Sequence, residues 1–214
     1  MAAIRALALL VALGTPVASA RAQSVMVGGA VHDDLQRFEG EAALNRLDGD
    51  SVGWMIFGGA RFGHFVARGE TSRDSTIRNT QSITLTIRGN PATIQSELSH
   101  DMQESAALGG YAVDIGGRFE VTGLGGVSFV TVHRAFTSDA AEQVLLPPST
   151  IPTTSVTTGI VDRFTAWTAE ADLSIRLSPH LHAIGGVRLQ PISLSDDLSG
   201  RSFRTLAGMV WQFK

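Results

Sequence analysis

The sequence predicts an all-β fold, an eight-stranded, antiparallel, up-and-down transmembrane β-barrel. Three observations predict it: an N-terminal export signal, a series of segments in which apolar and polar residues alternate, and connections that are alternately short and long. Alternation with a period of two places successive side chains on opposite faces of a β-strand. In a barrel that crosses a membrane, one face meets lipid and the other meets a polar interior.

The N-terminal signal has three parts. Arg5 supplies a positive charge, residues 6–13 form a short apolar run, and Ala18-Ser19-Ala20 has the small-x-small pattern that signal peptidase cleaves. The apolar run is far shorter than the ~20 residues that a membrane helix requires. We therefore predict a cleaved signal peptide at residues 1–20, with 22 or 23 as alternative ends, and a barrel domain at residues 21–214.

Composition agrees with an exported barrel. Of the 214 residues, 17% are charged, the net charge is -3 and there is no cysteine. The charged fraction is below the usual quarter, and the lack of cysteine excludes disulfides and thiolate metal sites. The near-neutral charge argues against a nucleic-acid partner, which would require a basic patch. Because no run of 18 apolar residues follows the signal, we expect the chain to cross the membrane as strands.

The pattern along the chain predicts eight strands and two kinds of connection. The expected strands are residues 25–36, 52–62, 65–72, 104–115, 119–133, 162–177, 181–192 and 201–213. The short connections are turns at 63–64, 116–118 and 178–180, and the long ones are loops at 37–51, 73–103, 134–161 and 193–200. Short turns on one rim and long loops on the other are typical of outer-membrane barrels, whose short turns face the periplasm. An even number of strands then places both termini in the periplasm.

Two of the long loops exceed ordinary connection lengths. Residues 81–88 alternate between aliphatic and polar side chains, which indicates either an extension of the third strand, the interpretation we favour, or a hairpin above the membrane. Residues 139–159 are rich in proline and threonine and predict an irregular, mobile loop.

The sixth strand shows the clearest two-faced pattern. Trp167 and Leu173 share a face with other apolar residues, while Glu170 and Asp172 share the opposite face. An outward Arg or Lys near the bilayer midplane costs roughly 2 to 4 kcal/mol, so the charged face should point inward. Extending this parity to the other strands predicts Gln190 and Gln212 inside, together with a charged interior made of Arg68, Glu70, Glu120, Glu170, Asp172, Arg176, Arg188 and Arg204.

These interior charges should pair with one another. The interior of an eight-stranded barrel is just wide enough for side chains to fill it, and an unpaired buried charge costs several kcal/mol. We expect Glu170 and Asp172 to form a network with Arg176, Arg188 or Arg204 that plugs the barrel. The alternative is that these residues line a narrow polar pathway.

The last strand predicts how the barrel closes. Its odd positions are mostly apolar and end in Trp211 and Phe213, which with Trp167 we assign to aromatic girdles at the membrane borders. Its even face contributes Arg204 to the interior. We expect this strand to pair with residues 25–36.

No catalytic, cofactor or metal site is predicted. Ser128 and His133 have opposite parities on one strand, so they do not share a face, and no Ser/His/acid set assembles by parity. His180 and His182 share a face but lack a third ligand, which favours polar rim residues over a metal site. The segments 32–34 and 99–101 are interpreted as solvated polar segments near loops. Glycine pairs at 58–59, 109–110, 125–126 and 185–186 are assigned to strand curvature.

Together, the signal, the glycine-rich segment 123–130, the pattern LSIRLSPHL at 173–181 and the closing aromatic strand resemble the small outer-membrane β-barrels of the OmpA and OmpX type. The resemblance covers nearly all of the mature chain and implies a monomer in the outer membrane. Its partners would be outer-membrane lipid, lipopolysaccharide and the barrel-assembly machinery. Lys214 departs from the family pattern, because it follows the terminal aromatic residue, and no peptidoglycan-binding domain is appended.

The function predicted from this reading is a structural or surface-interaction role carried by the extracellular loops of a plugged barrel. The alternatives are a narrow channel or carrier for small solutes and, less favoured, a lipid A-modifying enzyme. A soluble calycin-like carrier would have the opposite arrangement, with the apolar face inside.

Overall fold

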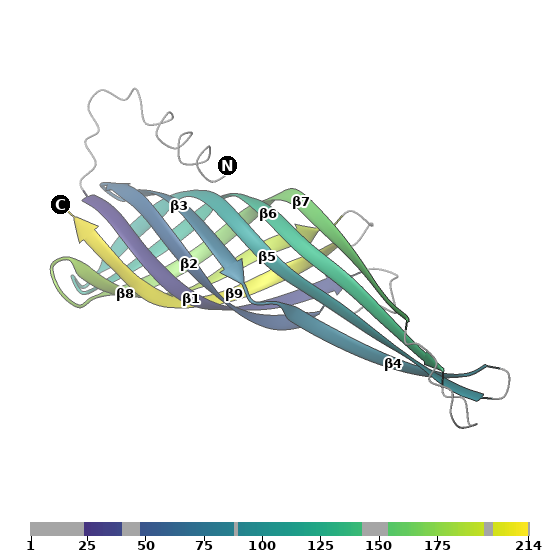
Figure 1. The fold of residues 1–214 in the computed structure, drawn as a ribbon. Helices are drawn as coiled ribbons and strands as arrows, with labels where there is room; N and C mark the ends of the chain where they lie inside the picture. The colour runs from purple at the N-terminus through teal and green to yellow at the C-terminus, as the bar shows by residue number, and fades with distance from the viewer. Residues whose placement is uncertain (1–23, 40–47, 88–89, 143–153, 195–198, 214) are drawn as a thin grey trace.

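The computed structural model describes residues 24–39, 48–87, 90–142, 154–194 and 199–213, which form one antiparallel sheet of nine strands (Figure 1). The strands are β1 Ser24–Glu39, β2 Gly49–Phe62, β3 Phe65–Asp74, β4 Ile77–Ile87, β5 Asn90–Ile115, β6 Phe119–Glu142, β7 Thr154–Arg176, β8 Leu181–Ser193 and β9 Ser199–Phe213. Within these residues, no helix is long and apolar enough to cross a membrane. The predicted signal peptide lies outside the described residues.

Eight of the strands close into a barrel. Neighbouring strands follow the order β3-β2-β1-β9-β8-β7-β6-β5, and the ring is completed where β3 pairs with β5. The first and last strands pair along their whole length, from Val25 opposite Phe213 to Glu39 opposite Ser199. The predicted eight-stranded antiparallel barrel and its closing strand pair are confirmed.

Three short connections lie at one end of the barrel, which we call the turn end. Gly63 has a φ of 65° in the β2–β3 turn, and Gly116 and Gly117 have φ values of 64° and 74° in the β5–β6 turn. Glycine adopts this left-handed conformation without the steric cost that other residues incur. Since β1 begins and β9 ends at this end, the described parts of both termini lie beside the turns (Figure 1).

Strands β4, β5, β6 and β7 continue past the barrel as a protruding sheet, which extends to the lower right in Figure 1. The prediction of loops at 73–103 and 134–161 is wrong for most of their length, because β5 begins at Asn90, β6 runs to Glu142 and β7 starts at Thr154. Residues rich in Thr, Ile and Val, such as 154–161, have high strand propensity and complete each other's hydrogen bonds across this sheet. Of the loop predicted to be irregular at 139–159, residues 143–153 lie outside the described residues.

Strand β4 combines both interpretations of residues 81–88. It continues the edge of β3, since Arg73 pairs with Gln103 and Ile77 pairs with His100 on the same strand β5. It also forms a hairpin with β5, ending where Ile87 pairs with Asn90. The protruding sheet is therefore an extension of the barrel wall built from a hairpin.

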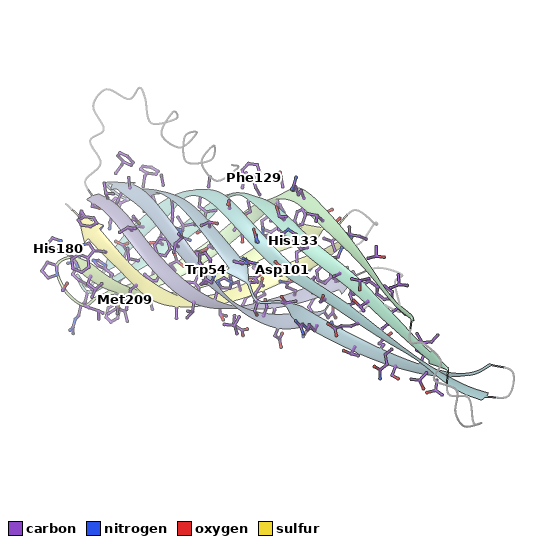
Figure 2. All side chains as sticks on the ribbon, in the orientation of Figure 1. Trp54, Asp101, Phe129, His133, His180 and Met209 are labelled. Atoms are coloured by element: carbon purple, nitrogen blue, oxygen red, sulfur yellow. The ribbon has the colours of Figure 1, made fainter. Side chains whose placement is uncertain are left out.

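The outer surface of the barrel has an apolar band between two rows of exposed aromatic residues. On β6 the band runs from Phe119 to Phe129. These ten steps rise ~3.3 Å each along the strand. With a strand tilt of ~40°, the band is about 25 Å tall along the barrel axis. Figure 2 shows His180 and Met209 toward the turn end, and Asp101 and His133 nearer the protruding sheet. The border toward the protruding sheet consists of Trp54, Phe129, Trp167 and Phe203, and the border at the turn end consists of Phe62, Phe65, Tyr111, Phe119, Trp211 and Phe213.

The paired glycines divide into two kinds. A Cβ on Gly126 would lie 2.1 Å from the carbonyl oxygen of Ala107, and one on Gly110 would lie 1.9 Å from that of Gly123. Their partners in sequence, Gly125 and Gly109, have room for a side chain. One glycine of each pair thus lets neighbouring backbones approach closely where the sheet coils, which agrees with the assignment to curvature.

Candidate functional site

The candidate site is the charged interior of the barrel. Strands β1, β3, β5, β7, β8 and β9 each turn alternate side chains inward, so charged residues far apart in sequence meet on the axis. Thr168, Glu170, Asp172 and Ser174 are buried on β7, while Trp167 and Leu173 on the opposite face are exposed. The facing of this strand is the one that its sequence pattern predicts.

Arg68 on β3 reaches across the barrel to β7. Its Nη1 donates a hydrogen bond of 2.8 Å to Oδ2 of Asp172, and its Nη2 binds Glu170. Nη2 also lies 3.1 Å from Oε2 of Glu70 on the same strand. The guanidinium carbon lies 5.1 Å from the centre of the Phe57 ring, an arrangement that adds a cation–π attraction.

Arg188 on β8 has no exposed surface. Its Nε donates to Oε2 of Glu170 at 2.7 Å, its Nη2 binds Glu70, and its Nη1 lies 3.3 Å from Oε1 of Glu104 on β5. Three carboxylates from three strands therefore surround one guanidinium.

Arg204 on β9 is also fully buried and binds a second set of carboxylates. Its Nη1 donates to Oε2 of Glu104 at 3.0 Å, and its Nη2 lies 3.3 Å from Oδ2 of Asp34 and 3.5 Å from Oδ1 of Asp74. Glu104 touches both Arg188 and Arg204, so it joins the two halves of the network. Ser128 also donates a 2.5 Å hydrogen bond to Glu104.

A layer of buried polar side chains lies beside Arg204, toward the protruding sheet. Nε2 of His32 lies 2.5 Å from Oδ1 of Asp74, and the amide of Gln36 donates to Asp34 at 3.3 Å and to Asp74 at 3.4 Å. His100 lies 3.0 Å from Oε1 of Gln36. The interpretation of residues 32–34 and 99–101 as solvated is wrong for His32, Asp34 and His100, which are buried because their even positions face the interior.

Apolar side chains also fill parts of the interior, which the sequence reading did not anticipate. Three buried clusters of apolar residues occupy it, and the one farthest toward the protruding sheet is packed against Phe38 and Phe164. That cluster contains Met102, Val130, Val132, Ile192 and Leu194. The charged network is therefore held within a packed interior, where ion pairs are only weakly screened.

The network is unequal in charge. Among the residues that the structure describes, its core holds three guanidiniums and six carboxylates, from Arg68, Arg188, Arg204, Asp34, Glu70, Asp74, Glu104, Glu170 and Asp172. Carboxylates outnumber guanidiniums, so the field inside the barrel favours protons and cations over anions.

Two of the residues expected in the network lie elsewhere. Glu120 binds Arg61 at the turn end, where Arg61 also lies 3.1 Å from Asp114. The expectation for Arg176 is wrong: it is the last residue of β7, where the interior opens to solvent, and it is exposed. Gln190 is buried, and Gln212 donates to Ser24 at 2.8 Å.

Glu104, Asp34 and Asp74 were missed by the sequence reading. The inward neighbours of Glu104 on β5, Ala106 and Leu108, are apolar, so that strand shows no polar face. Ala106 pairs with the inward residue Ser128 on β6, and Glu104 pairs with Val130, two residues farther along. Counting every second residue from Ser128 could therefore have identified Glu104 as an inward residue.

The remaining candidate residues are dispersed. Ser128 is buried inside the barrel, whereas His133 faces outward, with Nδ1 3.5 Å from Oδ2 of Asp101. His180 stacks on Trp211 at the turn end with ring centres 6.2 Å apart, and His182 is buried inside. In the described part of the chain, no three His, Asp or Glu residues are arranged to hold a metal ion.

No protein-family model matches the chain, and no curated protein does. Solved structures are similar to it. OprG, an outer-membrane protein of Pseudomonas aeruginosa, is 10% identical with a TM-score of 0.50, and the match covers 90% of this chain and 97% of OprG. Ail of Yersinia pestis is 13% identical (TM-score 0.45, 88% and 99% covered), and Neisserial surface protein A is 12% identical (TM-score 0.44, 89% and 97% covered). The chain has the fold of the small, eight-stranded outer-membrane β-barrel proteins.

Proposed function

We propose that this protein is an outer-membrane barrel whose interior is closed by the ion-pair network and which presents the protruding sheet at the cell surface. Its role would be structural or surface-interactive and not enzymatic. The observation that carries the proposal is the complete burial of Arg188 and Arg204 among carboxylates from β1, β3, β5 and β7.

The outer surface supports residence in a membrane. Large apolar side chains, among them Val27, Ile56 and Val127, are about half exposed, although such side chains are normally buried in soluble proteins. They form the band between the two aromatic borders, which is the arrangement of transmembrane barrels.

The cost of separating the ion pairs supports a closed interior. An ion could pass only if the guanidiniums of Arg68, Arg188 and Arg204 moved away from their carboxylates, and breaking a buried pair costs about 3 to 5 kcal/mol. The second candidate function, a narrow polar pathway, is favoured by the excess of carboxylates, which would select cations.

The protruding sheet supports a surface-interaction role. Strand β7 pairs with β8 only from Ala169 onward, so residues 154–168 have an open edge on that side. Strand β4 pairs with β5 on one side. Unpaired N–H and C=O groups along such edges can bind an extended segment of another protein.

The orientation is tested by epitope tags. A tag inserted between Pro147 and Pro148, in the connection from β6 to β7, should be detected by antibody on intact cells. A tag placed after Lys214 should be detected only after the outer membrane is permeabilised. The reverse pattern would contradict the proposed surface position of the protruding sheet.

Closure is tested by swelling of liposomes that contain the folded protein. Liposomes with the closed barrel should swell in isotonic solutions of small sugars no faster than protein-free liposomes. Swelling at rates that rise with the amount of protein would favour the channel.

A further inference from the structure

Glu170 and Asp172 are successive inward residues of β7 that bind the same guanidinium, and we call them the carboxyl pair. Nη1 of Arg68 donates a 2.8 Å hydrogen bond to Oδ2 of Asp172, and Nη2 of Arg68 binds Oε1 of Glu170. The two carboxyl groups lie within hydrogen-bonding reach of each other. Glu170 is 5% exposed and Asp172 is 7% exposed. Two negative charges held together in such a place repel each other strongly.

The guanidiniums that contact the carboxyl pair do not balance its charge. Arg68 and Arg188 contact the pair, but they also bind two other carboxylates, those of Glu70 and Glu104. Two positive charges thus serve four carboxylates. Glu104 also contacts a third guanidinium, that of Arg204, which supplies at most one more positive charge. Among the described residues, at least one negative charge in this part of the interior therefore lacks a counter-charge, and a buried charge in that state is strongly destabilising.

The strands beside Asp172 supply no further counter-charge. Asp172 is paired with Thr122 on β6 and with Gly186 on β8, and neither residue is charged. The other titratable groups on β6, β7 and β8 near this level lie toward the turn end or bind other carboxylates: Glu120, Arg176, His182 and Arg188. Within the described part of the chain, the charged groups that face Asp172 are thus Arg68 and the other member of the pair.

One oxygen of Asp172 indicates what completes the site. Its Oδ1 is buried, and no group donates a hydrogen bond to it. Buried carboxylate oxygens normally accept hydrogen bonds, whereas a protonated carboxyl group is itself a donor. A proton on Asp172 would remove the excess negative charge and would provide a hydrogen bond to the adjacent carboxylate of Glu170.

A proton fits this site better than a metal cation does. A Cβ added to Gly186 would lie 2.1 Å from Oδ1 of Asp172, so this oxygen lies directly against the backbone of β8. Calcium and magnesium ions bind several oxygen ligands at once. No three His, Asp or Glu side chains of the described residues are arranged to provide such a set.

We propose that Asp172 and Glu170 hold one proton between them at neutral pH and thereby form a proton-binding site inside the barrel. The proton lies in a hydrogen bond from the carboxyl group of Asp172 to the carboxylate of Glu170, and Arg68 binds the single negative charge that remains. Two carboxyl groups that share one site commonly share one proton in this way. Release of the proton would leave two negative charges on one guanidinium and weaken the connection between β3 and β7. The site belongs to the network whose closure is proposed above, but the inference rests on the contacts and not on closure.

The test is infrared spectroscopy of the protein folded in a detergent that has neither ester nor carboxyl groups. A protonated carboxyl group gives a carbonyl band that is separate from the bands of a carboxylate. The difference spectrum of the wild type minus D172N at pH 7 should contain this band, because an amide cannot bind the proton. E170Q should also lose the band, since the repulsion that holds the proton is then absent. The matched control is D114N, which removes an aspartate bound to Arg61 at the turn end and should leave the band unchanged.

The stability of D172N gives a second, independent readout. Its amide nitrogen replaces the protonated oxygen as a donor to Glu170, so at pH 7 the variant should unfold at the same urea concentration as the wild type or at a higher one. An ionised Asp172 would instead be a lost ion-pair partner of Arg68, and D172N would unfold at a lower urea concentration. Unboiled samples that migrate faster than boiled ones on gels confirm that each variant is folded.

The proposal would be overturned by a wild type that lacks the band at pH 7, by a band that persists in both D172N and E170Q, or by a clear loss of stability in D172N. A band that appears only when sodium is replaced by a bulky organic cation would assign the site to a metal cation and overturn the proton. Because infrared spectra do not measure the passage of ions, absence of the band leaves the closed barrel standing, and a conducting barrel that shows the band leaves the proton site standing.

Discussion

The guanidinium of Arg204 donates a hydrogen bond of 3.0 Å to Oε2 of Glu104 inside the barrel. The other oxygen of this carboxylate lies 3.3 Å from Nη1 of Arg188. Glu104 is therefore the one contact shared by the two halves of the network among the described residues. It is 3% exposed, so any loss of its charge leaves two buried guanidiniums short of a partner.

We expect E104Q to destabilise the barrel by about 3 kcal/mol, because removing one partner from a buried ion pair leaves an uncompensated charge. The free energy of unfolding is measured by urea titration in lipid vesicles, followed by tryptophan fluorescence. The control is E97Q: Oε1 of Glu97 lies 3.9 Å from the exposed Arg78, so its loss should cost less than about 1 kcal/mol. Equal effects of the two substitutions would show that Glu104 does not join the network.

A second prediction concerns the inward glycines. G126A should destabilise the barrel by roughly 2 kcal/mol, because the new Cβ would meet the carbonyl oxygen of Ala107 at 2.1 Å and the backbone of β5 would have to move. G123A, on the same strand, has no atom within 4 Å of its new Cβ and should change stability by less than about 0.5 kcal/mol. The temperature at which unboiled protein loses its fast gel migration measures both. A G126A variant as stable as G123A would contradict the close approach of β5 and β6.

A third prediction concerns pH. His100 lies beyond the membrane-spanning part of β5, since the outward residues beside it, Ser99, Asp101 and Gln103, are polar. Burial lowers the pKa of His100 to about 4, from an ordinary value near 6.5. The unfolded chain therefore binds more protons between these values, and stability that is fully present above pH 6.5 is lost as the pH falls toward 4.

The H100Q variant isolates this contribution. Glutamine does not titrate and keeps a donor for Gln36, so the variant should lose less stability between pH 7 and pH 4 than the wild type, by at most about 3 kcal/mol. Urea titrations of the two proteins at several pH values give this difference. Identical pH profiles would mean that His100 is not buried in its neutral form.

The sequence pattern predicts the barrel well because lipid and a polar interior impose opposite demands on the two faces of each strand. On β7 this contrast is complete, and it identifies Glu170 and Asp172 as inward residues. On β5 both faces carry small or apolar residues, so the pattern does not reveal Glu104. Apart from residues 81–88, most of the protruding sheet was predicted as loops, because its strands show no regular alternation between apolar and polar residues.

The interior network also depends on register, which one strand does not determine. Arg68 meets Asp172 across the interior of the closed barrel, over 104 positions of sequence. Arg204 meets Asp34, 170 positions away, because the two are paired where β9 and β1 close the barrel. The expected partnership with Arg176 failed because a strand end at the rim is open to solvent. The alternation of side chains along each strand predicts which residues face inward. Which of these residues contact one another depends on how the strands are paired in the closed barrel.

The closed interior is tested most directly by the ionic current across a planar bilayer that contains the folded protein. The account predicts that the current stays at the level of the protein-free bilayer, because Arg188 and Arg204 remain bound to their carboxylates across the interior. Steady ion-conducting openings in the wild type that E104Q abolishes would contradict it, because they would show that ions pass through this network.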